Sequence, residues 1–361
     1  MSSQRKPRAR EAGVPFDGTT GAFNAITDVP GIAVGLTTIV EGSARTGVTA
    51  IVPRAGEPEM RPVWAGIHRF NGNGEMTGSH WIEDGGYVNG PICITNTHSV
   101  GIVHHAAVRW MIRRYPRFAT DHLWAMPVVA ETYDGTTNDI NGQHVSEAHV
   151  LAALDGAKSG PVPEGNVGGG TGMIAYEFKG GTGTASRTVE IEGVSGTVGA
   201  LVQANHGTRD QLMVRGVPVG RHLRHDLLRQ RERGSIIGVI ATDLPMLPHQ
   251  LSRLARRGAL GIGRTGAIGE NGSGDIFLAI STANPLELPN RAPAVWRMEA
   301  LDDARFNAVY AAAIDAVEEA ILNAMLAAED TPTFRPAGKV VRALRAEELV
   351  ELLRRFGRVT G

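Results

Sequence analysis

The sequence predicts a layered α+β fold, and two observations support this prediction. Short apolar and β-branched runs bounded by glycines are mixed with longer runs whose apolar residues repeat every three or four positions. Their order is not the strict strand-helix-strand alternation of a doubly wound sheet. The chain has 46 glycines among 361 residues, a share far above the average glycine usage of about 7%. This glycine content favours tight turns and strand-rich layers over a helical bundle.

The first half of the chain is expected to begin with a tail and to continue with strands. Residues 1–20 contain four basic residues, two prolines and little apolar surface, which predicts a flexible N-terminal tail. Strands are predicted over residues 32–40, 48–52, 92–95 and 127–130. Helices are predicted over residues 105–115 and 142–154.

The second half repeats this mixture. Strands are predicted over residues 173–178, 196–204, 236–242 and 276–281, and helices over residues 247–257, 304–325 and 347–356. The apolar stripe of the 304–325 helix should face a core. Residues 221–234 are rich in charge and end in glycine, which predicts an exposed loop that leads into a buried strand.

Charge and cysteine content exclude several classes of function. The 36 Lys and Arg residues balance 37 Asp and Glu residues, so the chain has no general field for a nucleic acid. Cys93 is the only cysteine, which excludes an intrachain disulfide and a cysteine-based zinc cluster. Residues 1–18 lack the apolar core of a secretory signal, and no stretch is apolar enough to span a bilayer. We therefore expect a cytoplasmic protein with no membrane partner.

Three motif classes point to no cofactor and no metal. Residues 261–266 match G-x-G-x-x-G, but a helix rather than a strand is predicted before them, which argues against nucleotide binding. The glycine-rich residues 166–172 lack the Lys-Ser/Thr of a phosphate loop, so a turn beside a sheet or a close contact with substrate is expected. The twelve histidines show no ligand spacing for a metal. A serine protease triad stays open, because triads are recognised by geometry.

One serine stands where a predicted strand begins. Of four Gly-Ser dipeptides, only Gly234-Ser235 runs straight into an apolar strand. A cut before Ser235 would free an α-amino group whose ordinary pKa, about 7.7 to 8.0, suits a general base. Ser235 would then supply both nucleophile and base, and Gly234 would tolerate the strained backbone of an attack on its own carbonyl. The alternative is an ordinary strand start.

Several separated strings resemble one family. The chain is similar, from about residue 23 to residue 282 and more loosely beyond, to the self-processing aminopeptidases that include the L-aminopeptidase/D-esterase and the β-peptidyl aminopeptidases. The matching strings are residues 28–31 (DVPG), 130–135 (AETYDG), 203–207 (QANHG), 234–237 (GSII), 241–245 (ATDLP), 248–251 (PHQL) and 271–277 (NGSGDIF). Their number and order make the resemblance specific.

The resemblance implies a fold and a maturation step. It implies that residues 21–361 form one catalytic domain, a four-layer α-β-β-α sandwich like that of N-terminal-nucleophile hydrolases. It places a self-cleavage between Gly234 and Ser235, which would give chains 1–234 and 235–361 that stay associated. It further implies a homo-oligomer, a tetramer of processed pairs.

The resemblance also assigns catalytic roles. Ser235 matches the nucleophile, and Asn205 matches the residue whose neutral amide helps form the oxyanion hole, where it can stabilise charge without changing its protonation state. Ser273 matches a second serine that hydrogen-bonds near the nucleophile and its amine. Asp275 occupies the nearby acidic position, where a carboxylate would orient this network.

The remaining site residues concern the substrate. Glu131 and Tyr133 match the pocket segment, where a carboxylate would pair with the free ammonium group that marks an N-terminus. The alternative for Glu131 is a structural salt bridge. We expect an aminopeptidase that acts on short peptides, amides or esters through an acyl-enzyme, with the choice among α-, β- and D-residues left open. The alternatives are a hydrolase of nylon-type ω-amino-acid oligomers, whose relatives use threonine, and a processed assembly without catalysis.

Overall fold

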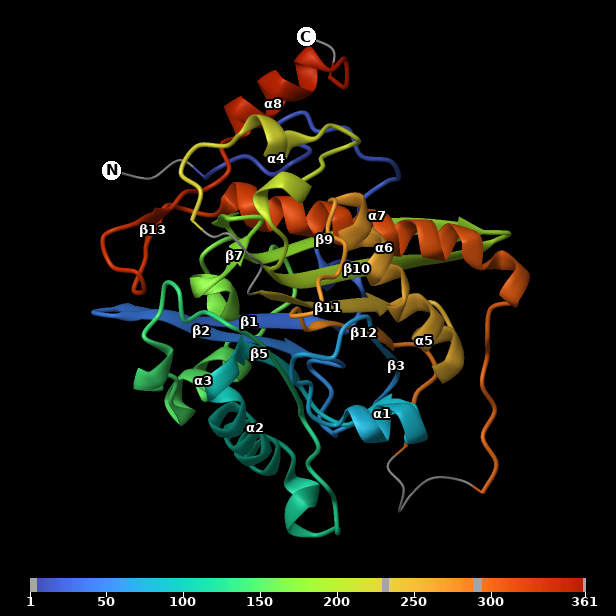
Figure 1. Cartoon of the computed structure of the whole chain (residues 1–361). Coiled ribbons are helices and arrows are strands. Elements are labelled where there is room, and N and C mark those ends of the chain that lie inside the picture. Colours follow the sequence, from blue (N-terminus) through green and yellow to red (C-terminus); the bar gives the residue numbers. More distant parts are fainter. Residues whose placement is uncertain (1–4, 229–233, 288–293, 360–361) are drawn as a thin grey trace.

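The computed structural model describes residues 5–228, 234–287 and 294–359. Two β-sheets stack face to face and helices cover both outer faces, which gives the layer order α-β-β-α (Figure 1). The predicted α+β class and four-layer sandwich are confirmed. Among the described helices, none has both the length and the apolar character that crossing a bilayer requires.

The first sheet has four strands in the order β1-β2-β5-β6. Its strands are β1 (Ala33–Glu41), β2 (Ala44–Val52), β5 (Ile92–Asn96) and β6 (Val128–Thr132). The β5–β6 pair is parallel, and the other pairs are antiparallel. Because Thr95 lies opposite Glu131 in this parallel pair, both strands end at the same edge of the sheet.

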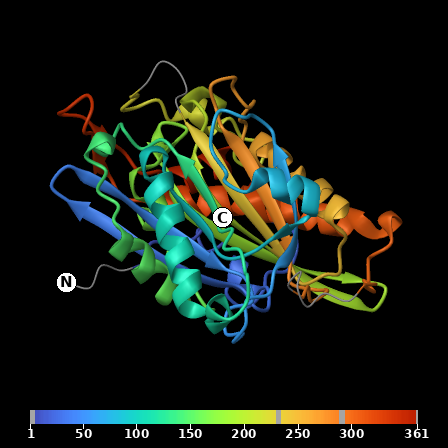
Figure 2. The ribbon, with the colours of Figure 1, turned by 90° about the horizontal axis from the view of Figure 1, so that it is seen from below.

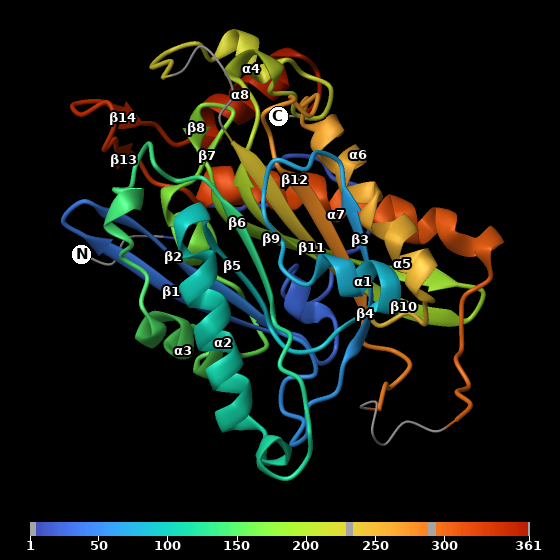
Figure 3. The same ribbon diagram turned by 60° about the horizontal axis from the view of Figure 1, so that its bottom comes forward.

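The second sheet has six strands in the order β4-β3-β12-β11-β10-β9. Its strands are β3 (Val63–Arg69), β4 (Tyr87–Val88), β9 (Gly181–Ile191), β10 (Val194–Asn205), β11 (Ser235–Thr242) and β12 (Asp275–Ser281). The central pair β11–β12 is parallel and lies between β10 and β3, as Figure 3 shows. Two small hairpins complete the strands: β7 (Ile174–Ala175) with β8 (Phe178–Lys179), and β13 (Thr331–Pro332) with β14 (Val340–Val341).

Helices close the sandwich on both sides. The outer face of the four-stranded sheet carries α2 (Val100–Arg114) and α3 (Glu147–Asp155), and Figure 2 shows the teal α2 lying across the blue β1–β2 hairpin. The outer face of the six-stranded sheet carries α5 (Pro248–Ala255), α6 (Arg257–Arg264) and α7 (Phe306–Ala327). The other helices are α1 (Ser79–Gly85), α4 (Val219–His222) and α8 (Ala346–Arg355). Short 3-10 turns include Thr97–Ser99 and Gly168–Gly172.

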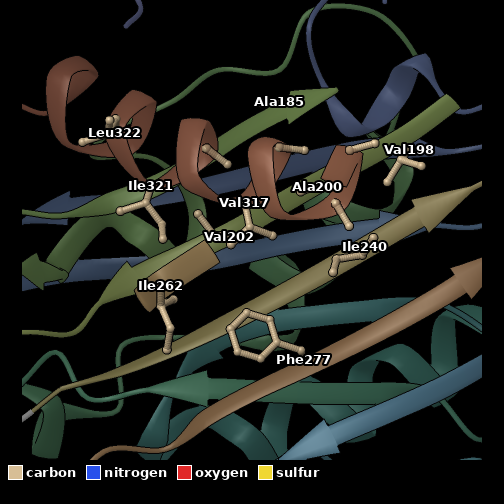
Figure 4. Packing of buried hydrophobic residues seen from close by; sticks show 14 of the residues in the cluster. Ala185, Val198, Ala200, Val202, Ile240, Ile262, Phe277, Val317, Ile321 and Leu322 are labelled. Atoms are coloured by element: carbon tan, nitrogen blue, oxygen red, sulfur yellow. The ribbon is translucent and has the colours of Figure 1, made fainter. Parts of the chain in front are cut away.

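Three apolar layers hold these elements together. Between the sheets, Ile94 of the first sheet belongs to the same buried cluster as Val239 and Leu278 of the second. Beneath the outer helices, Val317 and Ile321 of α7 pack toward the six-stranded sheet, as predicted for the 304–325 stripe (Figure 4). A third cluster joins α2 and α3 to the four-stranded sheet. Both faces of each sheet are therefore buried, which explains why the strands are apolar on both sides.

The N-terminal segment corrects one prediction. Residues 5–20 are not a free tail, because Ala9 and Val14 are buried and the Arg10 guanidinium lies 2.9 Å from the Glu319 carboxylate on α7. The Ala9 N–H also donates to the Asn323 side chain at 2.9 Å. The charges of this segment suggested solvent exposure, but Arg10 pairs with Glu319 on α7 and Arg8 pairs with Glu164, both far away in the sequence. Residues 1–4 lie outside the described residues.

Several elements differ from their predicted form. β3 and β9 were not expected, and the predicted strand 173–178 is instead the tight β7–β8 hairpin, with positive φ at Tyr176 and Glu177. The predicted helix 247–257 breaks at Arg256 into α5 and α6. As predicted, a helix and not a strand precedes the motif at residues 261–266, which begins inside α6. Residues 221–227 are largely exposed and lead towards a fully buried β11, as predicted, while residues 229–233 lie outside the described residues.

Candidate active site

Strand register brings the sequence-predicted residues to one edge of the sandwich. Asn205, the last residue of β10, lies opposite Ser235, the first residue of β11, and Asp275, the first residue of β12, lies beside Ile236. β6 of the other sheet brings Glu131 to the same place. A cavity of about 370 Å³ is lined by Asn73, Thr97, Glu131, Tyr133, Gly234, Ser235 and Gly272.

The Ser235 side chain is held at the floor of this cavity. It is 7% exposed, and its Oγ accepts a hydrogen bond of 2.9 Å from the Gly274 N–H. This hydrogen bond leaves the hydroxyl proton free to be given up. The hydroxyl is therefore positioned by backbone at the point where β12 begins.

Ser273 and Asp275 form a second polar group beside Ser235. Ser273 Oγ donates to Asp275 Oδ1 at 2.6 Å, and the Ile236 N–H approaches the same oxygen at 3.3 Å. Asn71 Nδ2 donates to Asp275 Oδ2 at 3.3 Å. Burial raises the pKa of Asp275, and these three donors oppose the shift. The Asp275 carboxyl thus contacts the residue that follows Ser235, and hydrogen bonds restrain both of its oxygens.

Gly234 is required by close packing. A Cβ atom at this position would lie 1.5 Å from the Asn205 carbonyl oxygen, far inside van der Waals contact. The residue must be glycine because β10 and β11 come together here.

The Asn205 side chain is fully oriented. Its Oδ1 accepts from the Ile174 N–H at 2.8 Å, and its Nδ2 donates to the Tyr133 carbonyl oxygen at 2.9 Å. An amide nitrogen carries two N–H groups. Among the described residues only Tyr133 accepts from Nδ2, and the Asn205 side chain is fully buried and is not one of the residues that line the cavity.

The Glu131 carboxylate is buried without a cationic partner among the described residues. Thr97 Oγ1 donates to its Oε2, and the Glu75 N–H donates to its Oε1 at 3.0 Å. Burial raises the pKa of Glu131, and these hydrogen bonds oppose the shift. No described ion pair engages Glu131, so the structural salt bridge that the sequence left open is not found there. The carboxylate instead faces the cavity with capacity for an ammonium group.

Tyr133 forms an outer wall of the cavity and is 40% exposed. Its phenol ring lies over Gly135, where a Cβ atom would come within 2.3 Å of the hydroxyl oxygen. The residue therefore contributes in two ways, with its ring at the cavity mouth and with its carbonyl oxygen on the Asn205 amide.

Sequence reasoning missed four contributors to this site: Asn71, Asn73, Thr97 and Gly274. The Asn-Gly-Asn-Gly string at residues 71–74 is a turn signal that could have drawn attention to this loop. Gly274 acts through its backbone N–H, for which no side chain gives a signal. Within the described ranges, no group of three or more His, Cys, Asp or Glu residues is arranged to hold a metal ion.

The fold and the position of Ser235 together define a class of protein. In this class the nucleophile is the first residue of an inner strand of a four-layer sandwich. Ser235 is likewise the first residue of β11, in the middle of the six-stranded sheet. This arrangement is that of the N-terminal-nucleophile hydrolases. Residues 24–337 match Peptidase family S58, and the chain belongs to that family.

Solved structures show the same fold over nearly the whole chain. The L-aminopeptidase D-Ala-esterase/amidase from Ochrobactrum anthropi, described as a prototype for the serine aminopeptidases and a variant of the N-terminal-nucleophile hydrolase fold, is 57% identical with a TM-score of 0.95. The match covers 98% of this chain and 100% of that one. A Burkholderia sp. β-aminopeptidase is 46% identical with a TM-score of 0.88, covering 97% and 99% of the two chains.

A curated relative matches equally well. The β-peptidyl aminopeptidase BapA from Sphingosinicella microcystinivorans is 47% identical over 383 aligned positions, which cover 99% of this chain and 94% of the relative. Together with the solved structures, this relative confirms the predicted family and the predicted class, a hydrolase with the N-terminal-nucleophile fold.

Proposed function

We propose that this chain cleaves its own Gly234–Ser235 bond and then acts as a serine aminopeptidase, releasing N-terminal residues from short peptides, amides or esters. The observation that carries the proposal is the position of Ser235, which lines one cavity together with the unpaired Glu131 carboxylate and lies opposite Asn205 in the β10–β11 register. The class agrees with the serine aminopeptidases among its relatives.

In the proposed maturation, Ser235 attacks the peptide bond that joins it to Gly234. Ser235 Oγ adds to the Gly234 carbonyl carbon, the C–N bond breaks, and the proton of the hydroxyl passes to the leaving nitrogen. The resulting ester between Gly234 and Ser235 is hydrolysed by water, which leaves a Gly234 carboxylate and a free Ser235 amine. Asp275, whose Oδ1 accepts from the N–H of the next residue, Ile236, would help to hold this new amine.

Turnover uses the same hydroxyl. The Ser235 amine takes the Oγ proton as Oγ attacks the substrate carbonyl, and it then gives the proton to the leaving amine. The second Nδ2–H of Asn205 donates to the oxyanion that develops in this step. Water hydrolyses the acyl-enzyme and frees the hydroxyl. Ser273 and Asp275 orient the amine between these steps.

Glu131 makes the reaction specific for N-termini. Its carboxylate pairs with the free ammonium of the substrate, while Tyr133 borders the mouth of the cavity. Relatives named for β-peptides, for L-residues and for D-alanine esters share this fold, so we extend the proposed substrates to α-, β- and D-configured residues.

The fold supports lasting association of the two chains. β11 and β12, which belong to residues 235–361, lie between β10 and β3 of residues 1–234 in one continuous sheet. The Arg187 guanidinium and the Glu319 carboxylate add a fully buried ion pair of 2.7 Å across the same boundary.

We further propose a single catalytic domain, a tetramer of processed pairs and a cytoplasmic location. Size-exclusion chromatography with light scattering would test the tetramer, and cell fractionation would test the location.

A substrate panel on processed protein tests the catalytic proposal. The panel contains chromogenic amides of α-, β- and D-residues, their N-acetylated forms and an ω-amino-acid dimer. Release from the free-amine amides alone is expected. Exclusive turnover of the ω-amino-acid dimer would instead favour a nylon-type hydrolase, and no release from any member would leave a processed assembly without catalysis.

A further inference from the structure

Lys179, on β8, is a buried charged residue that the proposed reaction does not use. Its side chain is completely enclosed, which is rare for lysine unless its charge is satisfied. Nζ donates to three backbone carbonyl oxygens, those of Met173 at 2.8 Å, Gly180 at 3.0 Å and Gly170 at 3.4 Å. This lysine therefore interacts with the main chain and not with solvent or substrate.

The three acceptors favour the ammonium form. A neutral amine has two N–H donors and would turn its lone pair towards the third carbonyl oxygen, whereas the ammonium has three donors. Burial lowers the pKa of Lys179 to about 7, and the charge of the buried Asp134 carboxyl opposes this shift. Each N–H of the ammonium thus has a backbone carbonyl oxygen as its acceptor.

One peptide group connects Lys179 to Asn205. The Met173 carbonyl oxygen accepts from Lys179 Nζ, and it also accepts from the Gly180 N–H at 2.9 Å. The N–H on the other side of that same peptide group belongs to Ile174 and donates to Asn205 Oδ1 at 2.8 Å. Lys179, the Met173–Ile174 peptide and the Asn205 amide form a continuous chain of hydrogen bonds.

We infer that Lys179 is a positioning residue of the oxyanion hole, acting on the Asn205 amide through the Met173–Ile174 peptide group. A cation on the carbonyl oxygen of an amide makes its N–H a stronger donor, and hydrogen bonds in a chain polarise one another in a low-dielectric interior. The Asn205 Nδ2–H is consequently a better donor and is held in one orientation. This inference depends on the proposed function, in which Nδ2 binds the oxyanion.

The competing role for Lys179 is purely structural. Its bond to Gly170 ties down the glycine-rich 3-10 turn Gly168–Gly172, which is packed against β2 and β9. A structural role predicts a loss of folded protein or of thermal stability, with normal turnover by the molecules that remain folded. A role through Asn205 predicts a loss of kcat in fully folded, fully processed enzyme.

A double-mutant cycle separates these roles. Lys179→Met, Asn205→Ala and the double variant are measured as processed enzyme, together with Lys6→Met, which removes a lysine that donates to the backbone oxygen of Ala328. We expect Lys179→Met to lower kcat roughly tenfold to a hundredfold with little change in KM, below the roughly 10²–10³ of an oxyanion donor itself. The double variant should be no slower than Asn205→Ala, and Lys6→Met should keep the normal kcat.

The outcomes that overturn or support the inference are distinct. Additive losses in the double variant, or a normal kcat for folded Lys179→Met, would overturn the inference. Near-normal kcat for Asn205→Ala alone would instead remove Asn205 from the proposed reaction, a different failure. If Lys179→Met does not fold, Lys179→Arg and Lys179→Gln replace it. Higher kcat in the charged arginine variant than in the glutamine variant supports the inference, and equal rates contradict it.

A spectroscopic measurement reports directly on the oxyanion site. The infrared carbonyl band of a slowly hydrolysed acyl-enzyme falls in frequency as its hydrogen bonds strengthen. Lys179→Met should shift this band to higher frequency, and Lys6→Met should not. An unchanged band in folded Lys179→Met would contradict a role through Asn205.

Discussion

At the scale of single residues, Glu131 determines which substrates the cavity accepts. Glu131→Gln removes the charge and nearly preserves the shape, so it should raise KM for free-amine substrates roughly 10- to 150-fold, the equivalent of about 1.5–3 kcal/mol. Self-cleavage should continue, because that step involves no substrate ammonium. Steady-state kinetics and intact mass provide both measurements. Equal turnover of free and N-acetylated substrates by the unmodified enzyme would exclude the ammonium site.

The raised pKa of Glu131 has a consequence for pH dependence. A carboxyl whose pKa is raised takes up its proton at a higher pH than an ordinary glutamate, so the ionised form is lost earlier as pH falls. KM for free-amine substrates should therefore rise on the acid side, at a pH above the ordinary glutamate value. In Glu131→Gln this acid rise in KM should disappear. An identical profile in both enzymes would show that another group titrates.

The close approach at Gly234 is testable with a single methyl group. Gly234→Ala would place a Cβ atom 1.5 Å from the Asn205 carbonyl oxygen, so β10 and β11 must separate where the bond is to be cut. We expect an uncut chain, destabilised by about 1–3 kcal/mol as for other overpacked sites. Gly263→Ala is the matched control, since its Cβ meets no atom within 4 Å. Normal processing of Gly234→Ala in an intact-mass measurement would contradict this account.

The sequence pointed to side chains of the candidate site but not to its backbone groups. Ser235 could be proposed because it follows glycine and begins an apolar strand, whereas Asn205 and Glu131 were assigned through the family resemblance. The structure places them around one edge of the sandwich. The Gly274 N–H and the Met173–Ile174 peptide group could not be proposed, because every residue except proline has such groups and only the fold decides where they point.

At the scale of elements, α7 is bound to the six-stranded sheet by charge as well as by apolar packing. The buried Glu319 carboxylate accepts from Arg187 at 2.7 Å, from Arg10 at 2.9 Å and from Asn24 at 2.6 Å. Glu319→Gln leaves the buried Arg187 without its counter-charge and should lower the free energy of unfolding on the order of 3 kcal/mol. Urea denaturation measures the change.

An exposed pair provides the control for Glu319. Glu351 on α8 pairs with Arg354 at 2.8 Å, and both side chains are largely in solvent. Glu351→Gln should change stability by less than about 1 kcal/mol. Similar losses in the two variants would mean that burial of the Glu319 pair contributes nothing specific.

The elements that the sequence predicted correctly are the apolar ones. β11, β12 and α7 have continuous or periodic apolar residues and appear close to their expected bounds. β9 was missed because Thr182, Thr184 and Ser186 look like loop residues, yet all three are buried. Thr184 Oγ1 accepts from the Ile26 N–H, and Ser186 Oγ donates to Asp28, so distant segments satisfy these hydroxyls. Local sequence cannot show such partners.

At the scale of the whole molecule, the proposal predicts two polypeptides. The purified protein should separate under denaturing conditions into about two-thirds and one-third of the chain, the smaller beginning Ser-Ile-Ile-Gly-Val. Ser235→Ala should remain one folded, inactive chain, because the attacking hydroxyl is absent. Intact mass and N-terminal sequencing are the measurements. Full activity in a preparation that contains only uncut chain would refute the mechanism.

The central position of β11 and β12 changes the meaning of stability once the bond is cut. While the chain is continuous, unfolding is unimolecular and its midpoint does not depend on how dilute the protein is. After the cut, complete unfolding also separates two polypeptides, so mass action enters and the midpoint falls on dilution. Because the two pieces share one sheet, their separation leaves β3 and β10 of one piece, and the outer sides of the β11–β12 pair of the other, as unpaired strand edges. After maturation, refolding would thus require two separate polypeptides to associate again before the six-stranded sheet can form.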